Sequence, residues 1–352
     1  MSDKFYLNGK ETTFIPGQMI LDAARNGGVE IPTLCYLKGA APTGACRICC
    51  VEVKGARSLM AACSTPVTPR MEVFTDTELV HNSRKMIVEF MLSSGKHNCL
   101  VCEANGNCRL QDLAYFYKIT KSRFPETENV YPTEDINPFI IRDFSRCILC
   151  GRCVQACNEV VVNRAISYGY RGAQSKIVTG GDQPYNNSEC VFCGQCVEVC
   201  PVGALTEKKS KGLGRSWETQ KIRTTCPYCG VGCQQWLHVK DGKIVKVTAV
   251  EDAQPNQDRL CVKGRFAYDF IYSEERLKTP LIRKKDGEFR EASWNEALDL
   301  VASKFKEIIK KDGPDAIAGV SCARSINEDS YQMQKFFRAV IGTNNIDHCA
   351  RT

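Results

Sequence analysis

Two stretches of this sequence, CILCGRCVQAC at residues 147–157 and CVFCGQCVEVC at residues 190–200, carry four cysteines each at the same intervals. In both stretches three cysteines stand three residues apart and the fourth follows four residues later. Cysteines spaced so closely can present several thiolates to one point. The repeat therefore predicts two related metal sites, and a single zinc ion could not easily use so many thiolates.

Cysteine dominates the whole composition, since 22 of the 352 residues are cysteines. Residues 1–10 contain neither a charged and apolar leader nor a twin-arginine pair, and no apolar run approaches the roughly 18 residues of a membrane span. These features predict a cytoplasmic protein without a membrane span. Disulfides are disfavoured in that reducing compartment, so the cysteines are interpreted as metal ligands.

The repeated run resembles that of the bacterial two-cluster ferredoxins. In such proteins three close cysteines hold one 4Fe-4S cluster and the fourth crosses to the other cluster. Asn158 takes the place of the usual proline after the first run, which leaves the ligands intact. The resemblance implies two crossed ligand sets, Cys147, Cys150, Cys153 and Cys200 for one cluster and Cys157, Cys190, Cys193 and Cys196 for the other.

A group nearer the N-terminus includes the loop GAAPTGACRIC at residues 39–49. Small residues let the backbone wrap an inorganic cluster closely, and a CxxC pair presents two thiolates to one metal. Zinc is the alternative. The spacing resembles the 2Fe-2S domain that opens the large subunit of respiratory complex I and of iron hydrogenases. The implied ligands are Cys35, Cys46, Cys49 and Cys63, and the adjacent Cys50 is interpreted as structural.

A second group consists of Cys99, Cys102 and Cys108, preceded by His97. Spacing alone would favour zinc. Directly after a 2Fe-2S domain, however, the group resembles the 4Fe-4S site of the same families that is held by three cysteines and one histidine. The family histidine usually lies four residues before the first cysteine, where this chain has Gly95. His97 is the candidate fourth ligand. The alternatives are a water or another side chain as the ligand, or a core role for His97.

A further group comprises CPYCGVGC at residues 226–233 and CVKGRF at residues 261–266. Both phrases resemble the 4Fe-4S segment that opens the molybdopterin oxidoreductases, and most closely that of the formate dehydrogenases. The resemblance implies that Lys263 lies between cluster and pterin and relays electrons; an ordinary surface lysine is the alternative. It also implies four cluster ligands, Cys226, Cys229, Cys233 and Cys261.

The same resemblance continues through ERLKTPLIR at residues 275–283 and FFRAVIGTNNIDHCART at residues 336–352. In formate dehydrogenases the latter phrase leads into the catalytic selenocysteine or cysteine and a much longer pterin-binding domain. We hypothesise that the codon after Thr352 is UGA, translated as a stop. Cys349 lies four positions too early to replace this ligand. His348, beside Cys349, is likewise not the expected catalytic histidine. Cys322 is interpreted as a core residue, and His81 and His238 as structural residues.

The formal charge of +7 does not predict a nucleic-acid partner, because it counts every cysteine as neutral. One 2Fe-2S and four 4Fe-4S clusters on thiolates would bring the charge to roughly −2. Some basic residues near the cysteines are expected to offset cluster charge, with ordinary surface positions as the alternative: Arg47, Arg109, Arg146 and Arg152.

The expected fold class is α+β and multi-domain. It comprises a β-grasp 2Fe-2S domain at 1–78, a 4Fe-4S segment with one histidine and three cysteines at 79–120, a two-cluster ferredoxin domain at 138–208, a 4Fe-4S domain of the molybdopterin type at 219–275, and the incomplete start of an α/β molybdopterin oxidoreductase domain at 276–352.

Local patterns predict the elements of these domains. An Asn8-Gly9 turn predicts a hairpin over residues 4–15. Helices are predicted at 18–25, 84–94, 109–118 and 328–340, and another after the capping box of Ser293 and Glu296, with Leu298, Val301, Phe305 and Ile308 on one face. Residues 315–320 are expected to be a buried strand, residues 125–138 a connector, and residues 207–223 a linker.

The resemblance implies an oxidoreductase that converts formate to carbon dioxide, or the reverse, at molybdenum or tungsten held by bis(molybdopterin guanine dinucleotide). Electrons would pass along the clusters to a partner: a flavin subunit using NAD, a ferredoxin, or a hydrogenase module. We expect the 352 residues alone to bind clusters without turning over formate.

Three rivals remain. An iron-only hydrogenase should lack the cysteine group at 226–261, and a complex I large subunit ordinarily lacks the run at 147–200. The third is a non-catalytic electron carrier or an inactive fragment.

Overall fold

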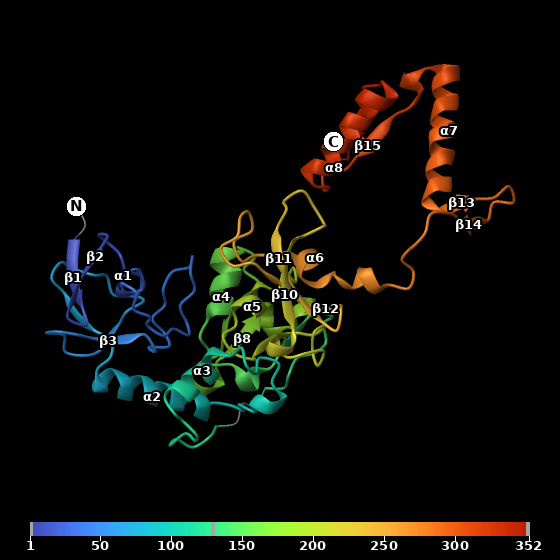
Figure 1. Ribbon diagram of the computed structural model, residues 1–352. Helices are drawn as coiled ribbons and strands as arrows, with labels where there is room; N and C mark the ends of the chain where they lie inside the picture. Colours follow the sequence, from blue (N-terminus) through green and yellow to red (C-terminus); the bar gives the residue numbers. More distant parts are fainter. Residues whose placement is uncertain (1–2, 128–130, 350–352) are drawn as a thin grey trace. The chain divides into compact units, whose positions relative to one another are not determined.

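The computed structural model describes residues 3–127 and 131–349 (Figure 1). They form two compact units, one of residues 1–220 with 239–245 and one of residues 221–238 with 246–352. Many short helices and strands confirm the predicted α+β, multi-domain class. Three predictions fall partly outside the described residues: those for the first ten residues, for the connector at 125–138 and for the phrase at 336–352. Among the described residues no helix is long and apolar enough to cross a membrane.

The first unit begins with a mixed sheet of five strands in the order β2-β1-β5-β3-β4. Its strands are β1 (Asp3–Leu7), β2 (Lys10–Phe14), β3 (Cys50–Val53), β4 (Met60–Ala61) and β5 (Glu72–Phe74). The pair β1 and β5 is parallel, whereas β1 and β2 are antiparallel. Helix α1 (Ile20–Asn26) packs its apolar residues against Phe5 in a core that also contains Cys49 and Cys63. This sheet around one helix is the expected β-grasp arrangement.

The predicted Asn8-Gly9 turn joins β1 to β2, and both residues have positive φ, 49° at Asn8 and 81° at Gly9. The Asn8 side chain also anchors the turn to the strand end at Thr75. Its carbonyl accepts from the Thr75 backbone N–H at 2.8 Å, and its amide donates to the Thr75 hydroxyl at 2.8 Å. The turn thus fixes the parallel pairing of β1 with β5.

Two helices connect this sheet to the middle of the unit. Helix α2 (Glu78–Ser93) begins six residues before the predicted start, because the Thr77 hydroxyl accepts from the Val80 N–H at 3.3 Å and caps it there. Helix α3 (Arg109–Phe116) agrees with its prediction. The two helices share an apolar core that includes Val88 and Leu110.

The middle of the unit consists of two antiparallel strand pairs and two short helices. β6 (Ile140–Arg142) pairs with β9 (Leu205–Glu207), β7 (Ile166–Gly169) pairs with β8 (Lys176–Thr179), and the helices are α4 (Arg152–Gln155) and α5 (Gln195–Val199). The first pairing brings the chain before Cys147 beside the chain after Cys200. The crossed ligand assignment requires this proximity.

The stretch at 207–223, predicted to be a linker, contains the boundary between the two units at residues 220 and 221. It is also tied to the first unit. The Arg215 guanidinium donates to the carbonyls of Cys102 at 2.6 Å and Leu100 at 2.9 Å, and the Gly212 N–H donates to Glu103 at 3.3 Å. One basic residue thus holds the linker against the loop that contains the second cysteine group.

The second unit contains short sheets and two longer helices. It contains most residues of the sheet formed by β10 (Gln220–Thr225), β11 (Gln234–Lys240) and β12 (Lys243–Ala249). It also contains the pair β13 (Leu281–Arg283) and β14 (Phe289–Glu291) and the pair β15 (Gly319–Ser321) and β16 (Ile346–His348). Its helices are α6 (Val262–Phe266), α7 (Trp294–Asp312) and α8 (Asn327–Lys335), which continues as a π-helical turn to Ile341. The parallel pair β15 and β16 agrees with an α/β domain.

The predicted cap of α7 is present, since the Ser293 hydroxyl accepts from the Glu296 N–H at 3.2 Å. Phe305 and Ile308 pack on the core around Phe337. Leu298 and Val301, predicted to share that face, are exposed instead. Those two side chains lie nearer the N-terminal end of the helix, outside this core.

The prediction of a buried strand at 315–320 is wrong in part. Residues Pro314–Ala316 form a 3-10 turn, and Val320 is exposed in the short strand β15. Side chains alternate across a strand, so Ile317 and the backbone at Gly319 face Phe337 while Val320 points away.

Replacement of Asn8 should loosen the N-terminal sheet. Asn8→Ala removes two hydrogen bonds to Thr75 and a residue that tolerates positive φ, so we expect a loss of about 1 to 3 kcal/mol in the opening free energy. Native-state hydrogen exchange of the β1 and β5 amides measures it. Thr13→Ala, an exposed change on the same hairpin, should stay within about 0.5 kcal/mol. Equal protection in the two variants would contradict the assigned role of the turn.

Candidate metal centres

The two ferredoxin-type runs adopt one backbone conformation, residue by residue. Leu149 and Phe192, each just before the second cysteine of its run, have φ values of 52° and 50°. Gly151 and Gly194, each just after that cysteine, have φ values of 75° and 72°. Positive φ is costly for bulky residues, so its repetition indicates a loop whose shape is set by what it surrounds. In the second run the Phe192 N–H donates to Cys190 Sγ at 3.4 Å.

Four cysteines from both runs line one cavity. They are Cys147, Cys150, Cys153 and Cys200, the set that the crossed assignment predicted. The rest of the lining is largely apolar, including Phe144, Ile177 and Leu205. Four thiols that line one cavity fit the four ligands of a 4Fe-4S cluster.

The other four cysteines of the runs also lie together. Burial is the largest cause of the raised pKa of Cys190, and the nearby thiols of Cys157 and Cys193 raise it further. The pKa of Cys196 is likewise raised by burial first, and then by Cys193, Cys190 and Cys157. Cys196 in turn acts on Cys153 of the first set. The two crossed sets are therefore neighbours.

Burial keeps these thiols protonated in the absence of a metal. It raises the pKa of Cys147 to about 11, and those of Cys150 and Cys196 to about 12. Thiols are metal ligands only as thiolates, so loading these sites must release protons and bring in compensating positive charge. Arg152 can supply part of this positive charge. Burial lowers the pKa of its guanidinium, but the nearby thiols raise it, namely Cys150, Cys200 and Cys35.

The first cysteine group is equally compact. Cys35 shares hydrogen bonds with Cys46 and Cys63, and Cys63 with Cys49. These bonds hold the pKa of Cys35 well below its usual range and lower that of Cys49 to about 7, at the expense of their partners. Cys50 points elsewhere, with its Sγ 3.8 Å from the Ser83 hydroxyl, which agrees with a structural role.

The second group lines one cavity, whose lining includes His97, Cys99, Cys102 and Cys108. His97 Nε2 lies 3.0 Å from the Met91 carbonyl, which can only accept. That contact places the proton on Nε2 and leaves Nδ1 as the nitrogen able to bind a metal. Burial lowers the pKa of His97, which favours the neutral form that a ligand needs. Arg146 also lines this cavity.

The group of the second unit is assembled from one loop and the start of α6. Burial is the largest cause of the raised pKa of Cys233, and three nearby thiols raise it further, those of Cys226, Cys229 and Cys261. The Cys226 N–H also donates to the Cys233 carbonyl at 2.8 Å. Cys261 precedes the first residue of α6, so Lys263 lies in its first turn, with an exposed side chain. The structure thus brings together the four predicted cysteines and sets Lys263 beside them in the chain.

Three sites of the first unit share one apolar core. Its buried members include Leu34, Ile48 and Val202, and several ligand candidates pack against it, namely Cys46, Cys108, Cys147 and Cys200. A second contact joins the loop of the first group to the ferredoxin-type segment, since the Ala41 N–H donates to Glu159 at 2.8 Å. The first, second and third groups are therefore contiguous.

The remaining candidates lie apart from these sites. The prediction that Cys322 is a core residue is wrong, because Cys322 is exposed. It comes directly after the last residue of β15. Its Sγ lies 3.7 Å from that of Cys349 beyond the paired strand β16. His81 contacts Asp76 and stacks on Phe116, and His238 contacts the Thr248 hydroxyl, which agrees with structural roles.

Zinc was the alternative for the first two groups. Among the described residues, no three His, Cys, Asp or Glu side chains converge as the ligands of a single ion would. Sequence reasoning missed the supporting residues Gly203, Arg142 and Tyr185, since a lone glycine, arginine or tyrosine carries no ligand signal.

Gly203 leaves room for a ligand of the second group. A Cβ atom there would lie 2.3 Å from Cys102 Sγ. Gly203→Ala should therefore remove about four iron atoms per chain and the signal of that cluster in electron paramagnetic resonance. Gly180→Ala, where a Cβ meets nothing within 4 Å, is the matched control. Full iron content in both variants would contradict the assignment.

His97→Ala should have a similar and equally local effect, because it removes the only non-cysteine ligand proposed. We expect loss of about four iron atoms, with iron restored but a changed spectrum in His97→Cys. His81→Ala is the control. An unaltered spectrum in His97→Ala would exclude His97 as a ligand.

Comparison with known proteins assigns family models to successive segments of the chain. They are the 2Fe-2S iron-sulfur cluster binding domain at residues 4–78, the NADH-ubiquinone oxidoreductase-G iron-sulfur binding region at 84–123, the ferredoxin-like domain of NADH-quinone oxidoreductase subunit 3 at 137–206, the molybdopterin oxidoreductase Fe4S4 domain at 219–273, and molybdopterin oxidoreductase at 276–352.

Curated relatives match almost the whole chain. NADPH-Fe(3+) oxidoreductase subunit alpha of Geobacter sulfurreducens is 39% identical over 98% of this chain and 40% of its own length. A subunit of an NADH-quinone oxidoreductase of Rhizobium meliloti is 38% identical over 95% and 39%. A Staphylococcus aureus protein provisionally named a formate dehydrogenase is 34% identical over 98% and 39%. The chain thus spans about 40% of the length of these relatives.

One solved structure also resembles this chain. A chain of an NAD+-reducing [NiFe]-hydrogenase superposes with a TM-score of 0.57 at 32% identity, covering 61% of this chain and 91% of that one. The order of domains, the grouping of the cysteines and these likenesses are consistent with one another. The chain therefore carries, in this order, a 2Fe-2S domain, iron-sulfur domains of the NADH-quinone oxidoreductase type, a molybdopterin oxidoreductase Fe4S4 domain and the start of a molybdopterin oxidoreductase domain.

Proposed function

We propose that this chain is the electron-transfer part of the catalytic subunit of a cytoplasmic formate dehydrogenase that uses molybdenum or tungsten. One observation carries the proposal: the cysteines of CPYCGVGC and Cys261 come together directly before a molybdopterin oxidoreductase segment. A cluster in that place links a pterin site to the clusters of the first unit.

The proposal assigns five clusters to the predicted domains. Residues 1–78 would hold one 2Fe-2S cluster, and residues 79–120, 138–208 and 219–275 would hold one, two and one 4Fe-4S clusters on the cysteines and His97 described above. When bound, the clusters accept and pass on single electrons. The chain's own residues hold them close together: Leu34, Ile48 and Val202 exclude water between three of the sites.

Formate as substrate is supported by the phrases at 226–233 and 261–266 and by the Staphylococcus relative. Oxidation of formate gives carbon dioxide, one proton and two electrons at Mo- or W-bis(molybdopterin guanine dinucleotide). Lys263 would pass these electrons to the cluster of the second unit. The metal-ligating selenocysteine or cysteine would follow Thr352.

A second candidate is an electron carrier of an NAD(P)H-linked complex with no formate chemistry. It is favoured by the Geobacter relative, whose name specifies NADPH, and by the NAD+-reducing hydrogenase chain. Both candidates need an electron-transfer partner, such as a flavin subunit, a ferredoxin or a hydrogenase module.

Formate and NADPH distinguish the candidates in the protein extended through its pterin domain. We expect formate to bleach the cluster absorbance and reduce a viologen dye, and Lys263→Ala to slow that reduction at least tenfold while iron content stays unchanged. The 352-residue chain alone should bind iron yet leave formate untouched.

Lys285→Ala, an exposed lysine of the same unit, is the control. Reduction of the clusters by NADPH and a flavin partner, with none by formate, would establish the second candidate instead. Formate-dependent dye reduction by the 352-residue chain itself would refute the assignment of catalysis to a segment outside it.

A further inference from the structure

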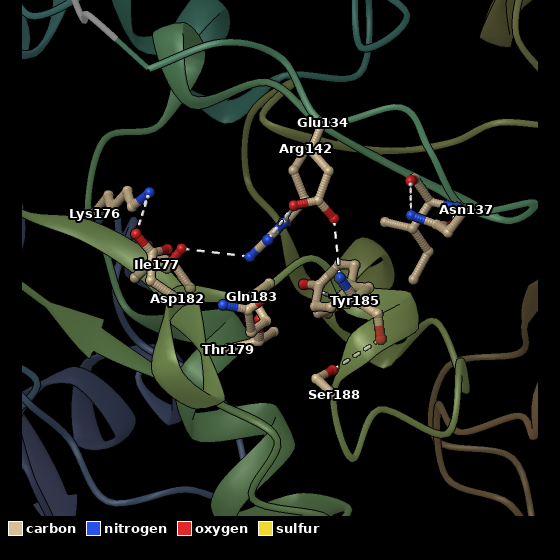
Figure 2. Close-up of polar contacts among 12 residues, drawn as sticks. Glu134, Asn137, Arg142, Lys176, Ile177, Thr179, Asp182, Gln183, Tyr185 and Ser188 are labelled. Carbon is tan, nitrogen blue, oxygen red and sulfur yellow. Dashed lines mark hydrogen bonds and ion pairs between the residues drawn. The ribbon is translucent and has the colours of Figure 1, made fainter.

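Figure 2 shows a polar network around Glu134, Arg142 and Tyr185. Arg142 and Tyr185 place it beside the two ferredoxin-type sites. At its centre is Arg142, the last residue of β6, whose side chain is only 4% exposed. Its guanidinium forms an ion pair with one oxygen of Glu134, and the other oxygen of that carboxylate accepts from the Tyr185 backbone N–H at 3.1 Å. Glu134 thus fixes both the cation and the start of the segment that carries Tyr185.

Tyr185 connects this network to a predicted ligand. Its side chain is fully buried, and its hydroxyl donates to Cys196 Sγ at 3.8 Å. Burial raises the pKa of this phenol well above its usual value, so it stays a neutral donor. The Arg142 guanidinium carbon lies 4.3 Å from the centre of the Tyr185 ring, which holds the ring in place.

Arg142 faces both ligand sets. It lines the cavity around Cys147, Cys150, Cys153 and Cys200. Its positive charge also acts on Cys190 and lowers the pKa of that thiol, against the larger effect of burial. The carboxylate of Glu134, which neutralises Arg142, belongs to the segment before β6 and does not line the cavity. Of the two charged groups, Arg142 is therefore the one that faces the two sites.

The two sites differ in the tyrosine beside them. Tyr168, the tyrosine next to the first set, donates to the Leu149 carbonyl at 3.2 Å rather than to a sulfur. Its ring is half exposed, whereas Tyr185 is enclosed. The repeated loops are alike in backbone, so their environments rather than their ligands distinguish them.

We propose that Tyr185 and Arg142 set the reduction potentials of this cluster pair, with Tyr185 raising that of the cluster held by Cys157, Cys190, Cys193 and Cys196. Reduction adds an electron to the cluster and its thiolates. A hydroxyl aimed at Cys196 and a buried guanidinium both stabilise that added negative charge. The hydroxyl contact therefore favours an added electron on the cluster beside Tyr185. This inference rests on the proposed function, since it requires clusters at both sites.

The test is an electron paramagnetic resonance redox titration of the iron-loaded full chain. The signal of the second cluster is identified by its loss in Cys193→Ser. Tyr185→Phe keeps the ring under Arg142 and removes only the hydroxyl, so it should decrease the ratio of reduced to oxidised second cluster about tenfold, which for one electron is about 59 mV. Tyr168→Phe, the matched control, should leave both potentials in place.

Glu134→Gln provides a shift of opposite sign. The amide oxygen can still accept from the Tyr185 N–H, while Arg142 loses its compensating charge, so both potentials should rise. If Tyr185→Phe fails to load iron, electron-nuclear double resonance of the unsubstituted protein decides: an exchangeable proton coupled to the second cluster supports the hydroxyl contact, and its absence overturns it.

Failure of this inference is distinguishable from failure of the proposed function. Two intact 4Fe-4S signals with unchanged potentials in Tyr185→Phe and Glu134→Gln would overturn the tuning role and leave the electron-transfer function standing. Absence of both signals from the unsubstituted loaded chain would overturn the proposed function, and the tuning role with it.

Discussion

Convergence of thiols from separate segments is the constraint on which the rest of the first unit depends. Cys200 must reach the cavity lined by Cys147, Cys150 and Cys153, and this requires the chain beyond Cys200 to lie beside the chain before Cys147. The pairing of β6 with β9 and the hydrogen bond from the Asp143 N–H to the Ala204 carbonyl at 2.8 Å achieve it. Segments of this size bury little apolar surface, so metal ligation is expected to supply much of their stability.

The same constraint explains the shared core of the first unit. Val202 and Ala204 follow directly from the crossing cysteine and pack with Leu34 and Ile48 beside the first group. Gly203 lies between them and gives Cys102 of the second group its space. One short stretch thus touches the first three groups, and electron transfer between them would need no separate connecting structure.

The negative charge of cluster-bound thiolates must also be balanced around the ferredoxin-type runs. Burial makes free thiolates unfavourable at Cys147, Cys150 and Cys153, so cations must be held nearby when a cluster is bound. Arg152 and Arg146 occupy such places, as their position beside the runs suggested. Arg142 does so as well, and its pairing with Glu134 reduces the cost of its own burial.

The sequence by itself determined the grouping of the cysteines, the Asn8-Gly9 hairpin, the cap at Ser293 and the multi-domain α+β class, because spacing, turn chemistry and capping are local. It did not determine that Arg215 would tie a basic stretch to the loop of Cys102, or that Val320, Leu298 and Cys322 would be exposed. Nor did it reveal the Tyr185 hydroxyl at Cys196. Only the tertiary structure decided these, because each depends on which face of an element is covered by residues far away in the chain.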